Sequence, residues 1–508
     1  MPYVGNKPEV GNFRKCDAIT TSATATYNLL VGGVAVNPNQ NQVICSLNGV
    51  VQSSGDSFTI ASSQITFAST LASSDVIDFI LILGDTLDVG VPSDDTVDAS
   101  KITANVITGQ TALGATPADT DELLISDAGT LKRVDYSYLK SSVVNRPNAM
   151  PLIINGDMAV AQRATSVTGW NAVGYTTVDR FKTVCEIGTY TIIQESLTSG
   201  NAFADGFKNA LRMDCTTATA SGSAGDQTTF EYRMEGFDAL SFKKGTANAQ
   251  KSTLAFWVKA SKTGSNLQVN LRDNTNDRQV GGTYSISSAN TWEHKVINFP
   301  ADTTGALADA STAELIIEWW LDGGSNYSGG AVPTSWEAKD NADRNVTNFD
   351  LGGSTSNDWA ITGVQFEVGE YSASTLPPYQ FQSYGGNLIR CQRYYEKSFE
   401  QGITPAAGTS APDGRVFGSW DGASARTQID FNTTKRTAPT VTVYRGSNAG
   451  SGTATGTANF IYSGAWNNHT CTSNNADDSM VSLTGSTSNF TTNGAFVAEL
   501  NFTADAEL

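Results

Sequence analysis

The sequence S-T-L-A-F-W-V-K-A-S at residues 252–261 places an apolar side chain at every second position, and W-A-I-T-G-V-Q-F-E-V-G at residues 359–369 does the same. The apolar positions are Leu254, Phe256 and Val258 in the first stretch and Val364, Phe366 and Val368 in the second. Because successive side chains of a strand point to opposite faces, this alternation predicts strands with one buried face. Such strands suit two antiparallel sheets that pack face to face.

The composition agrees with a mainly β chain. Among the 508 residues are 47 glycines, and 39% of the residues are hydrophobic. Together with the abundance of Thr, Ser and Asn, this predicts short strands joined by many turns. A chain of this length is too long for one hydrophobic core, so we expect about three or four domains.

The charge of the chain limits its partners. There are 32 basic and 50 acidic side chains, which give a formal net charge of −18. Proteins that bind nucleic acids or anionic membranes concentrate positive charge, so we expect neither as the main partner.

The start M-P-Y-V-G-N-K-P-E lacks the apolar segment of a secretion signal. The six cysteines include no C-x-x-C pair, and we expect them to be free and buried.

The N-terminal part predicts a small β-sandwich or barrel. Residues 26–84 alternate apolar and polar side chains, with a hairpin turn at Asn48-Gly49. The ordered stretches M-P-Y-V-G-N, S-L-N-G-V-V-Q, I-T-F-A and S-S-D-V-I-D-F resemble the N-terminal module of tail fibres from tailed bacteriophages. This resemblance implies that residues 1–90 attach the protein to other tail proteins of a virion.

A connector is predicted at residues 91–148. Val97, Ile102 and Val106 have spacings compatible with a short helix or a helical coil. So short an apolar stripe cannot bury itself alone, which favours packing between chains in a homotrimeric stalk. The other interpretation is an ordinary linker whose helix docks on its own domain.

The central block, residues 149–385, is predicted to be a jelly-roll sandwich. Five stretches carry a family resemblance: L-I-I-N-G-D-M-A-V-A-Q-R-A-T, Y-T-T-V-D-R-F, S-T-L-A-F-W-V-K-A-S, N-T-W-E-H-K-V and W-A-I-T-G-V-Q-F-E-V-G. Their order resembles that of phage-fibre domains similar to jelly-roll carbohydrate-binding modules. The resemblance implies a glycan-binding fold.

The stretch R-C-Q-R-Y-Y-E-K-S-F at residues 390–399 combines a cysteine with basic and aromatic side chains. A nucleophilic Cys391 would need a base, and no histidine in the sequence is closer than His469. Tyrosines and arginines suit a buried joint between domains. The stretch also resembles the tract that follows this domain in phage fibres. We therefore interpret it as a joint within residues 386–508.

The C-terminal part is predicted to be a β-sandwich that forms a receptor-binding tip. Its final segment alternates apolar and polar residues, and F-T-A-D-A-E-L resembles the distal domains of the same fibres. Two loops place aromatic side chains among amides, and we expect Trp420, Tyr462, Trp466 and His469 to contact a host glycan. Aromatic faces stack on sugar rings, and amides bond hydroxyl groups.

Trp320 is a further candidate for glycan binding. Strand alternation in I-E-W-W-L-D places Trp319 in the core and Trp320 on the opposite face, beside two carboxylates. There the indole could stack on a pyranose ring. The other interpretation is that Trp320 packs against a neighbouring subunit or a covering loop such as residues 332–336.

A structural calcium is implied by the carbohydrate-binding-module resemblance. Asn155 and Asp157 lie at the start of the domain, where such modules often hold calcium, and Glu367 lies on the closing strand. Oxygen ligands suit this ion. The alternative is that Asp157 caps a turn. We expect no other cofactor.

We expect a structural virion protein, a homotrimeric phage tail fibre exposed to the extracellular medium. It would bind a host surface glycan or an outer-membrane receptor through its distal domains. We do not expect an enzyme, since no carboxylate pair stands out and no repeat suggests a parallel β-helix. The alternatives are a tailspike-like fibre that also cleaves a surface polysaccharide, as a hydrolase or lyase, and a cellular lectin or adhesin.

Overall fold

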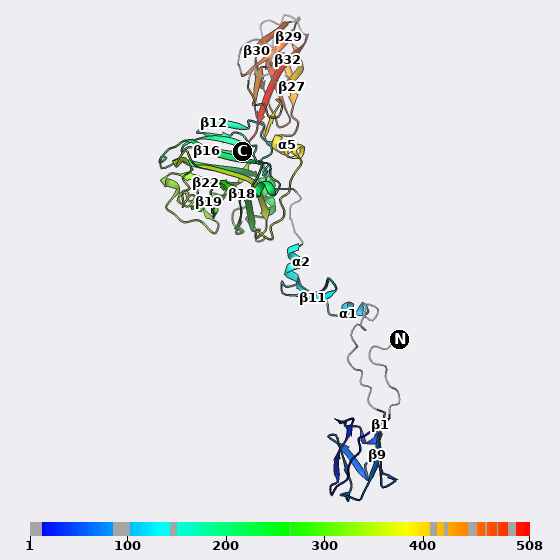
Figure 1. Ribbon diagram of the computed structural model, residues 1–508. Helices are drawn as coiled ribbons and strands as arrows, with labels where there is room; N and C mark the ends of the chain where they lie inside the picture. Colours follow the sequence, from blue (N-terminus) through cyan, green and yellow to red (C-terminus); the bar gives the residue numbers. More distant parts are fainter. Residues whose placement is uncertain are drawn as a thin grey trace. The chain divides into compact units, whose positions relative to one another are not determined.

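The computed structural model describes residues 13–84, 102–142, 150–264, 266–406, 414–420, 425–445, 455–462, 465–474, 476–485 and 494–508. The chain divides into two compact units, Met1–Ala118 and Asp119–Leu508. Strands dominate both units, as the alternating sequence predicts (Figure 1). Over the residues just given, no helix is long and apolar enough to cross a membrane.

The N-terminal domain has two small sheets around one core. One sheet runs β1 (Phe13–Lys15), β9 (Ile77–Leu83), β5 (Val43–Leu47), β6 (Val50–Val51), and the other runs β2 (Thr26–Asn28), β8 (Gln64–Phe67), β7 (Phe58–Ala61). A short hairpin pairs β3 (Leu30–Val31) with β4 (Val34–Ala35). Cys45, Phe58 and Ile65 are buried between the sheets. Asn48 and Gly49 have φ values of 47° and 80°, which gives the tight turn that their sequence predicts.

The connector contains little regular structure. It consists of α1 (Asn105–Thr108), a hairpin of β10 (Glu122–Asp127) with β11 (Thr130–Asp135), and α2 (Tyr136–Ser142). The helix at the predicted apolar stripe is thus only four residues long, and Val97 lies outside the described residues. All six residues of β10 are exposed, because a two-stranded hairpin has no second layer to cover it.

The central domain is a jelly-roll-like sandwich of two antiparallel sheets. One sheet has six strands, in the order β12 (Ser166–Trp170), β15 (Thr189–Ser196), β16 (Asn209–Thr217), β24 (Asp358–Val368), β18 (Ser252–Ala260), β21 (Glu293–Phe299). The other has seven, in the order β13 (Val173–Tyr175), β14 (Phe181–Cys185), β17 (Gln227–Glu235), β22 (Ala313–Gly323), β19 (Asn266–Asp273), β20 (Arg278–Ser285), β23 (Glu337–Ala338). The chain crosses between the sheets repeatedly, and α4 (Gly236–Ala239) lies in one of these crossings, from β17 to β18. The helix α3 (Asn201–Ala204) connects β15 to β16 within the six-stranded sheet.

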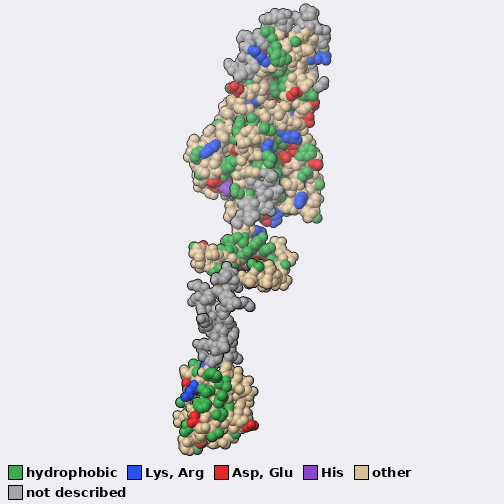
Figure 2. Space-filling model, turned by 90° about the vertical axis from the view of Figure 1, so that its right-hand side faces the viewer, with side chains coloured by type: hydrophobic (Ala, Val, Ile, Leu, Met, Phe, Trp, Pro, Cys, Tyr) green, Lys and Arg blue, Asp and Glu red, His purple; other side chains and the backbone are tan. Residues whose placement is uncertain are grey.

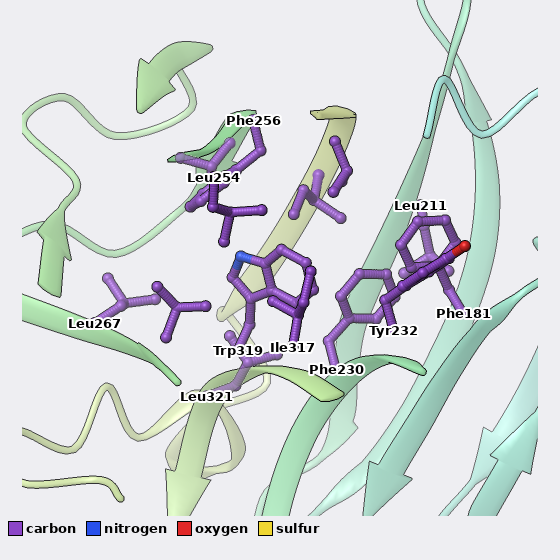
Figure 3. Close-up of a cluster of buried hydrophobic side chains, with 14 of the residues drawn as sticks. Phe181, Leu211, Phe230, Tyr232, Leu254, Phe256, Leu267, Ile317, Trp319 and Leu321 are labelled. Carbon is purple, nitrogen blue, oxygen red and sulfur yellow. The ribbon is translucent and has the colours of Figure 1, made fainter. Parts of the chain in front are cut away.

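The core of the sandwich is formed by the inward-facing side chains of both sheets. Trp319 of the seven-stranded sheet lies at its centre, fully buried (Figure 3). Its ring centroid lies 5.5 Å from that of Phe230 and 5.7 Å from that of Phe256 on the opposite sheet. Leu254 and Phe256, in the alternating stretch that predicts this fold, are both fully buried.

The C-terminal domain follows a joint made of α5 (Tyr384–Gln392) and β25 (Tyr395–Lys397). Its strands are β26 (Gly414–Trp420), β27 (Ala425–Asp430), β28 (Thr440–Arg445), β29 (Thr457–Tyr462), β30 (Ala465–Asn474), β31 (Met480–Gly485) and β32 (Gly494–Asp505). Pairing runs β32, β26, β27, β31, β30, β29 and returns to β32. The strands therefore close into a barrel, which β25 and β28 extend at the end of β32 nearest the joint.

Candidate functional site

Trp420 is not available for glycan binding in this structure. Only 4% of its surface is exposed, and it packs in the barrel core with Ala425 and Phe460. The expected exposure is wrong because Trp420 belongs to β26, whose alternation turns Val416 and Trp420 inward. Its position next to a loop suggested a loop side chain, although it is the last residue of the strand.

The other predicted tip residues are described only in part. His469 is half-buried in β30, and its ring lies 5.8 Å from that of Phe460. The side chains of Tyr462 and Trp466 lie outside the described residues. Their backbones belong to the β29–β30 hairpin, where Ile461 pairs with Trp466. Their role in receptor contact stays a prediction.

Trp320 is on the predicted face but is fully buried. Residues between β22 and β24 cover it: the guanidinium of Arg344 lies 4.8 Å from its ring, and the Tyr327 ring lies 4.8 Å away. The proposed open stacking surface is therefore wrong, and the covering-loop interpretation describes this indole. Alternation correctly placed Trp319 and Trp320 on opposite faces, but it carries no information on what covers each face.

The predicted calcium ligands have other partners. The Asn155 side chain donates to the carbonyls of Val160 and Asp179, and it accepts from the Val160 N–H. Asp157 accepts from Asn387 of α5, and Glu367 accepts from Gln365 on its own strand. Burial raises the pKa of Asp157.

The part of the chain that the structure describes contains no group of three His, Cys, Asp or Glu side chains placed to hold a metal. Asn155 has a φ of 62° and holds a turn against α5, which fits the turn interpretation better. Calcium binding stays a prediction.

A hollow that the sequence did not reveal opens on the outer face of the six-stranded sheet. Its volume is about 380 Å³. Its lining is Asp205, Phe207, Trp257, His294, Gly363, Gln365, Ala373, Leu376, Pro377, Pro378, Tyr379 and Phe381. We call it the Trp257 hollow. Trp257 belongs to the alternating stretch of β18, where it points away from the core and is half-buried.

Four aromatic rings and one imidazole contribute to the wall of the Trp257 hollow. The Trp257 and His294 rings lie 5.1 Å apart on neighbouring strands, and Phe207 lies 4.8 Å from Tyr379 and 5.0 Å from Phe381. Phe381 is 49% exposed, so one wall of the hollow is an open aromatic surface.

Glycine at position 363 allows this aromatic packing on the sheet. It lies in β24 where the pairing with β18 is irregular, and its φ is 61°. A Cβ there would come within 2.7 Å of the Phe207 ring. Glycine therefore permits both the strand irregularity and the close approach of the ring.

The polar groups of the Trp257 hollow suit hydroxyl ligands. Burial lowers the pKa of His294, although Asp205 raises it, so the imidazole is neutral at neutral pH and offers one donor and one acceptor. Asp205 is exposed and supplies a carboxylate. Among the side chains that line this hollow, Asp205 carries the only carboxylate, whereas most glycosidases place two across the sugar.

A second, wider hollow of about 970 Å³ lies on the outside of the barrel. Phe417 of β26 stands in it with 76% of its surface exposed, and Arg426, Gln428, Ser482 and Thr484 surround it. This aromatic residue was missed, although the same alternation that buries Trp420 turns Phe417 outward. It is the described part of the barrel that is best equipped to contact a ligand.

The Arg390–Phe399 tract is a buried joint. Cys391 is fully buried, and burial raises the pKa of its thiol well above the ordinary value, which does not suit a nucleophile. Tyr394 stacks beneath the Arg180 guanidinium, 3.3 Å from the ring centroid, and Tyr395 beneath that of Arg163, at 3.7 Å. Both arginines belong to the jelly roll, so the tract links it to the barrel.

No protein-family model matches the chain, and no curated protein matches its sequence. Among solved structures, the enzymatically active domain of bacteriophage CBA120 tailspike protein 4 matches with a TM-score of 0.22 and 13% identity, over 43% of this chain and 21% of that one. The CBM22-1 xylan-binding domain of Paenibacillus barcinonensis Xyn10C matches with a TM-score of 0.20 and 8% identity, over 42% of this chain and 99% of that domain.

A third match is to the CBM22-1–GH10 modules of Clostridium thermocellum endo-1,4-beta-D-xylanase 10B, complexed with xylohexaose. Its TM-score is 0.21 at 12% identity, over 42% of this chain and 30% of that one. Carbohydrate-binding modules and a phage tailspike domain are thus among the structures that the chain resembles. Similarity at this level assigns neither a family nor a ligand to the chain.

Proposed function

We propose that the chain is a tail fibre of a tailed bacteriophage that binds a host surface glycan without cleaving it. The observation that carries this proposal is the Trp257 hollow, in which aromatic rings and hydroxyl-bonding groups meet on the outside of a sandwich. Residues 1–90 would attach the fibre to the tail, as their sequence resemblance implies. The protein would then be located on the virion.

Binding in the Trp257 hollow follows from ordinary sugar chemistry. The apolar face of a pyranose ring stacks on Trp257 or Phe381, while His294 and Asp205 bond its hydroxyl groups. Its volume of about 380 Å³ is at the small end of ligand sites, which suits one or two sugar units. A single lining carboxylate favours binding over glycoside hydrolysis.

The homotrimer belongs to this proposal, and the connector supports it. Leu124 and Leu131 are 69% and 67% exposed on one face of the β10–β11 hairpin, and Leu123 and Ile125 are exposed on the other. Apolar residues on both faces of a lone hairpin need partners, and further copies of the chain would supply them.

Replacing Trp257 by Ala tests the glycan site. We expect retention of the protein on an array of neutral oligosaccharides to fall about tenfold or more, because the stacking surface is lost. Trp257→Phe should retain part of the binding. The matched control is Phe237→Ala, which removes a 49% exposed ring from α4, outside the hollow.

Thermal unfolding of each variant separates binding from folding. Trp257→Ala with unchanged retention would contradict the proposed site, and so would an equal loss in Phe237→Ala. Loss of retention with a preserved unfolding midpoint supports it.

A further inference from the structure

A group of charged side chains lies on the outer face of the seven-stranded sheet, on the opposite side of the sandwich from the Trp257 hollow. Lys182 of β14 pairs across the strands with Glu231 of β17, which pairs with Glu318 of β22. Arg233 of β17 and Arg272 of β19 both pair with Ile316 of β22, the strand that lies between β17 and β19. Cross-strand partners share a face of the sheet, so these side chains stand together.

The cationic side chains of this group outnumber its carboxylates. Glu231 accepts from Arg233 at 2.9 Å, and Glu318 accepts from both Arg272 at 2.7 Å and Arg344 at 2.9 Å. Lys182 has no hydrogen-bond or ion-pair partner among the described residues. Four cations therefore face two carboxylates in a chain whose net charge is −18. We call these six residues the basic cluster.

Neighbouring acids do not cancel this excess. Asp277, which also acts on Arg272, is paired with Lys339 at 2.7 Å. Glu507, which also acts on Lys182, is paired with Arg180. The positive charge is thus left for a ligand or for solvent.

The electrostatics show that the cations repel one another. Partial burial lowers the pKa of Lys182, and Arg233 and Arg272 lower it further, whereas Glu231 raises it. At Glu318, burial opposes the charged form, but Arg344 and Arg272 outweigh it and hold the pKa at about 2. A bound anion would relieve the repulsion at Lys182, since opposite charges stabilise the protonated amine.

Donor groups remain free for such an anion. Arg233 uses Nε and one terminal nitrogen on Glu231, and Arg272 uses Nε on Glu318 and a terminal nitrogen on Asn274. Each guanidinium keeps its other terminal nitrogen without a partner among the described residues. Together with the Lys182 ammonium, three cationic side chains therefore offer N–H groups to a ligand. The Arg233 side chain is 21% exposed and the Arg272 side chain 16% exposed, so both can be reached from solvent.

We propose that the basic cluster binds the carboxylate or phosphate group of an acidic polysaccharide, as a second glycan site on the jelly roll. The proposal rests on the proposed glycan-binding function for its ligand class. Oxyanions match the forked donors of arginine, and lysine adds a point charge.

The experiment compares Lys182→Gln and Lys182→Glu with the parent protein in affinity electrophoresis. The gels contain polygalacturonate, a glycerol-phosphate polymer, or dextran as the neutral probe. We expect about tenfold weaker retention by an anionic polymer for Lys182→Gln, a greater loss for Lys182→Glu, and no change with dextran. The control, Lys251→Gln, removes an exposed lysine paired with Glu370.

The outcomes are distinct. Loss with polygalacturonate alone identifies a carboxylate ligand, and loss with the phosphate polymer alone identifies a phosphate ligand. Unchanged retention of both Lys182 variants overturns the site, as does an equal loss in Lys251→Gln. If Trp257→Ala leaves neutral-sugar binding intact while Lys182→Gln weakens anion binding, the proposed hollow fails and the basic cluster stands.

Discussion

At the scale of single residues, the side chain of Asp179 is a carboxyl group that is shielded from solvent. It is fully buried, and its oxygens accept from the backbone and side-chain N–H groups of Gln162 at 3.0 and 2.5 Å. Arg163 lies 3.9 Å away. Burial outweighs these favourable contacts and raises the pKa of Asp179 to about 6. The charged form therefore costs folding free energy at neutral pH.

Replacing Asp179 by Asn should remove a pH dependence. Because the pKa is about 6 in the folded state against 3.8 in the unfolded state, the folded protein holds an extra proton between these values. Its contribution to stability is complete below about pH 3.8 and is lost as the pH rises through 6. Relative to Asp179→Asn, the parent should lose about 2 kcal/mol between pH 4 and pH 7.

Urea unfolding of both proteins across this range measures the difference, and other titrating groups cancel in the comparison. Parallel stability curves for the parent and Asp179→Asn would show that Asp179 does not titrate in this way.

At the scale of elements, the joint between the jelly roll and the barrel depends on two adjacent tyrosines. Tyr394 and Tyr395 are 1% and 5% exposed, and each lies beneath an arginine of the jelly roll. Residues after β32 complete the joint, since Glu507 pairs with Arg180 and with Arg163. Segments from three distant parts of the sequence are thus packed together.

Replacing Tyr394 and Tyr395 together by Ala should lower the free energy of unfolding by several kcal/mol, because two large buried rings are lost. Cys391→Ser should leave glycan retention nearly unchanged, because the thiol contacts no ligand site. Thermal unfolding and the oligosaccharide array measure the two effects. Phe237→Ala, which removes a 49% exposed ring from α4, is the control.

An unchanged unfolding midpoint in the double tyrosine variant would contradict the joint. Loss of glycan retention in Cys391→Ser at unchanged stability would restore a functional role for the thiol.

The alternation of inward-facing and outward-facing side chains along single strands could be predicted from the sequence. Which segments cover the outer faces of the sheets could not. The positions of Leu254, Phe256 and Trp319 in the core follow from a period of two. Whether Trp257 or Trp320 stays accessible depends on loops far away in the sequence, which leave one half-open and bury the other. The basic cluster was missed for the same reason, because its residues come from separate strands that only the sheet order brings together.

At the scale of the whole molecule, the described part of the connector exposes many large apolar side chains. The exposed large apolar residues of the connector include Ile102, Val106, Ile107, Leu113, Leu123, Leu124, Ile125, Leu131, Tyr138 and Leu139. Figure 2 shows hydrophobic side chains on the surface of this part of the chain. Monomeric soluble proteins rarely expose large apolar patches, and contact between copies would bury these side chains.

Light scattering on the purified chain should give the mass of three copies. Replacing Leu124 and Leu131 by Asp should shift the protein toward one copy, because charges on the shared face of the hairpin oppose apolar contact. The matched control is Val173→Asp, which alters a 49% exposed position on the jelly roll. A monomeric parent chain would contradict the trimer and revive the lectin alternative.

The joint also has a mechanical consequence. β32 pairs with β25 and β28 near Asp505, and the residues beyond it are tied to Arg163 and Arg180. When a force pulls along β32, its inter-strand hydrogen bonds lie perpendicular to the force. They therefore share the load and must rupture together. Stretching of a single chain should accordingly extend the connector first, while the barrel and the jelly roll resist as one unit.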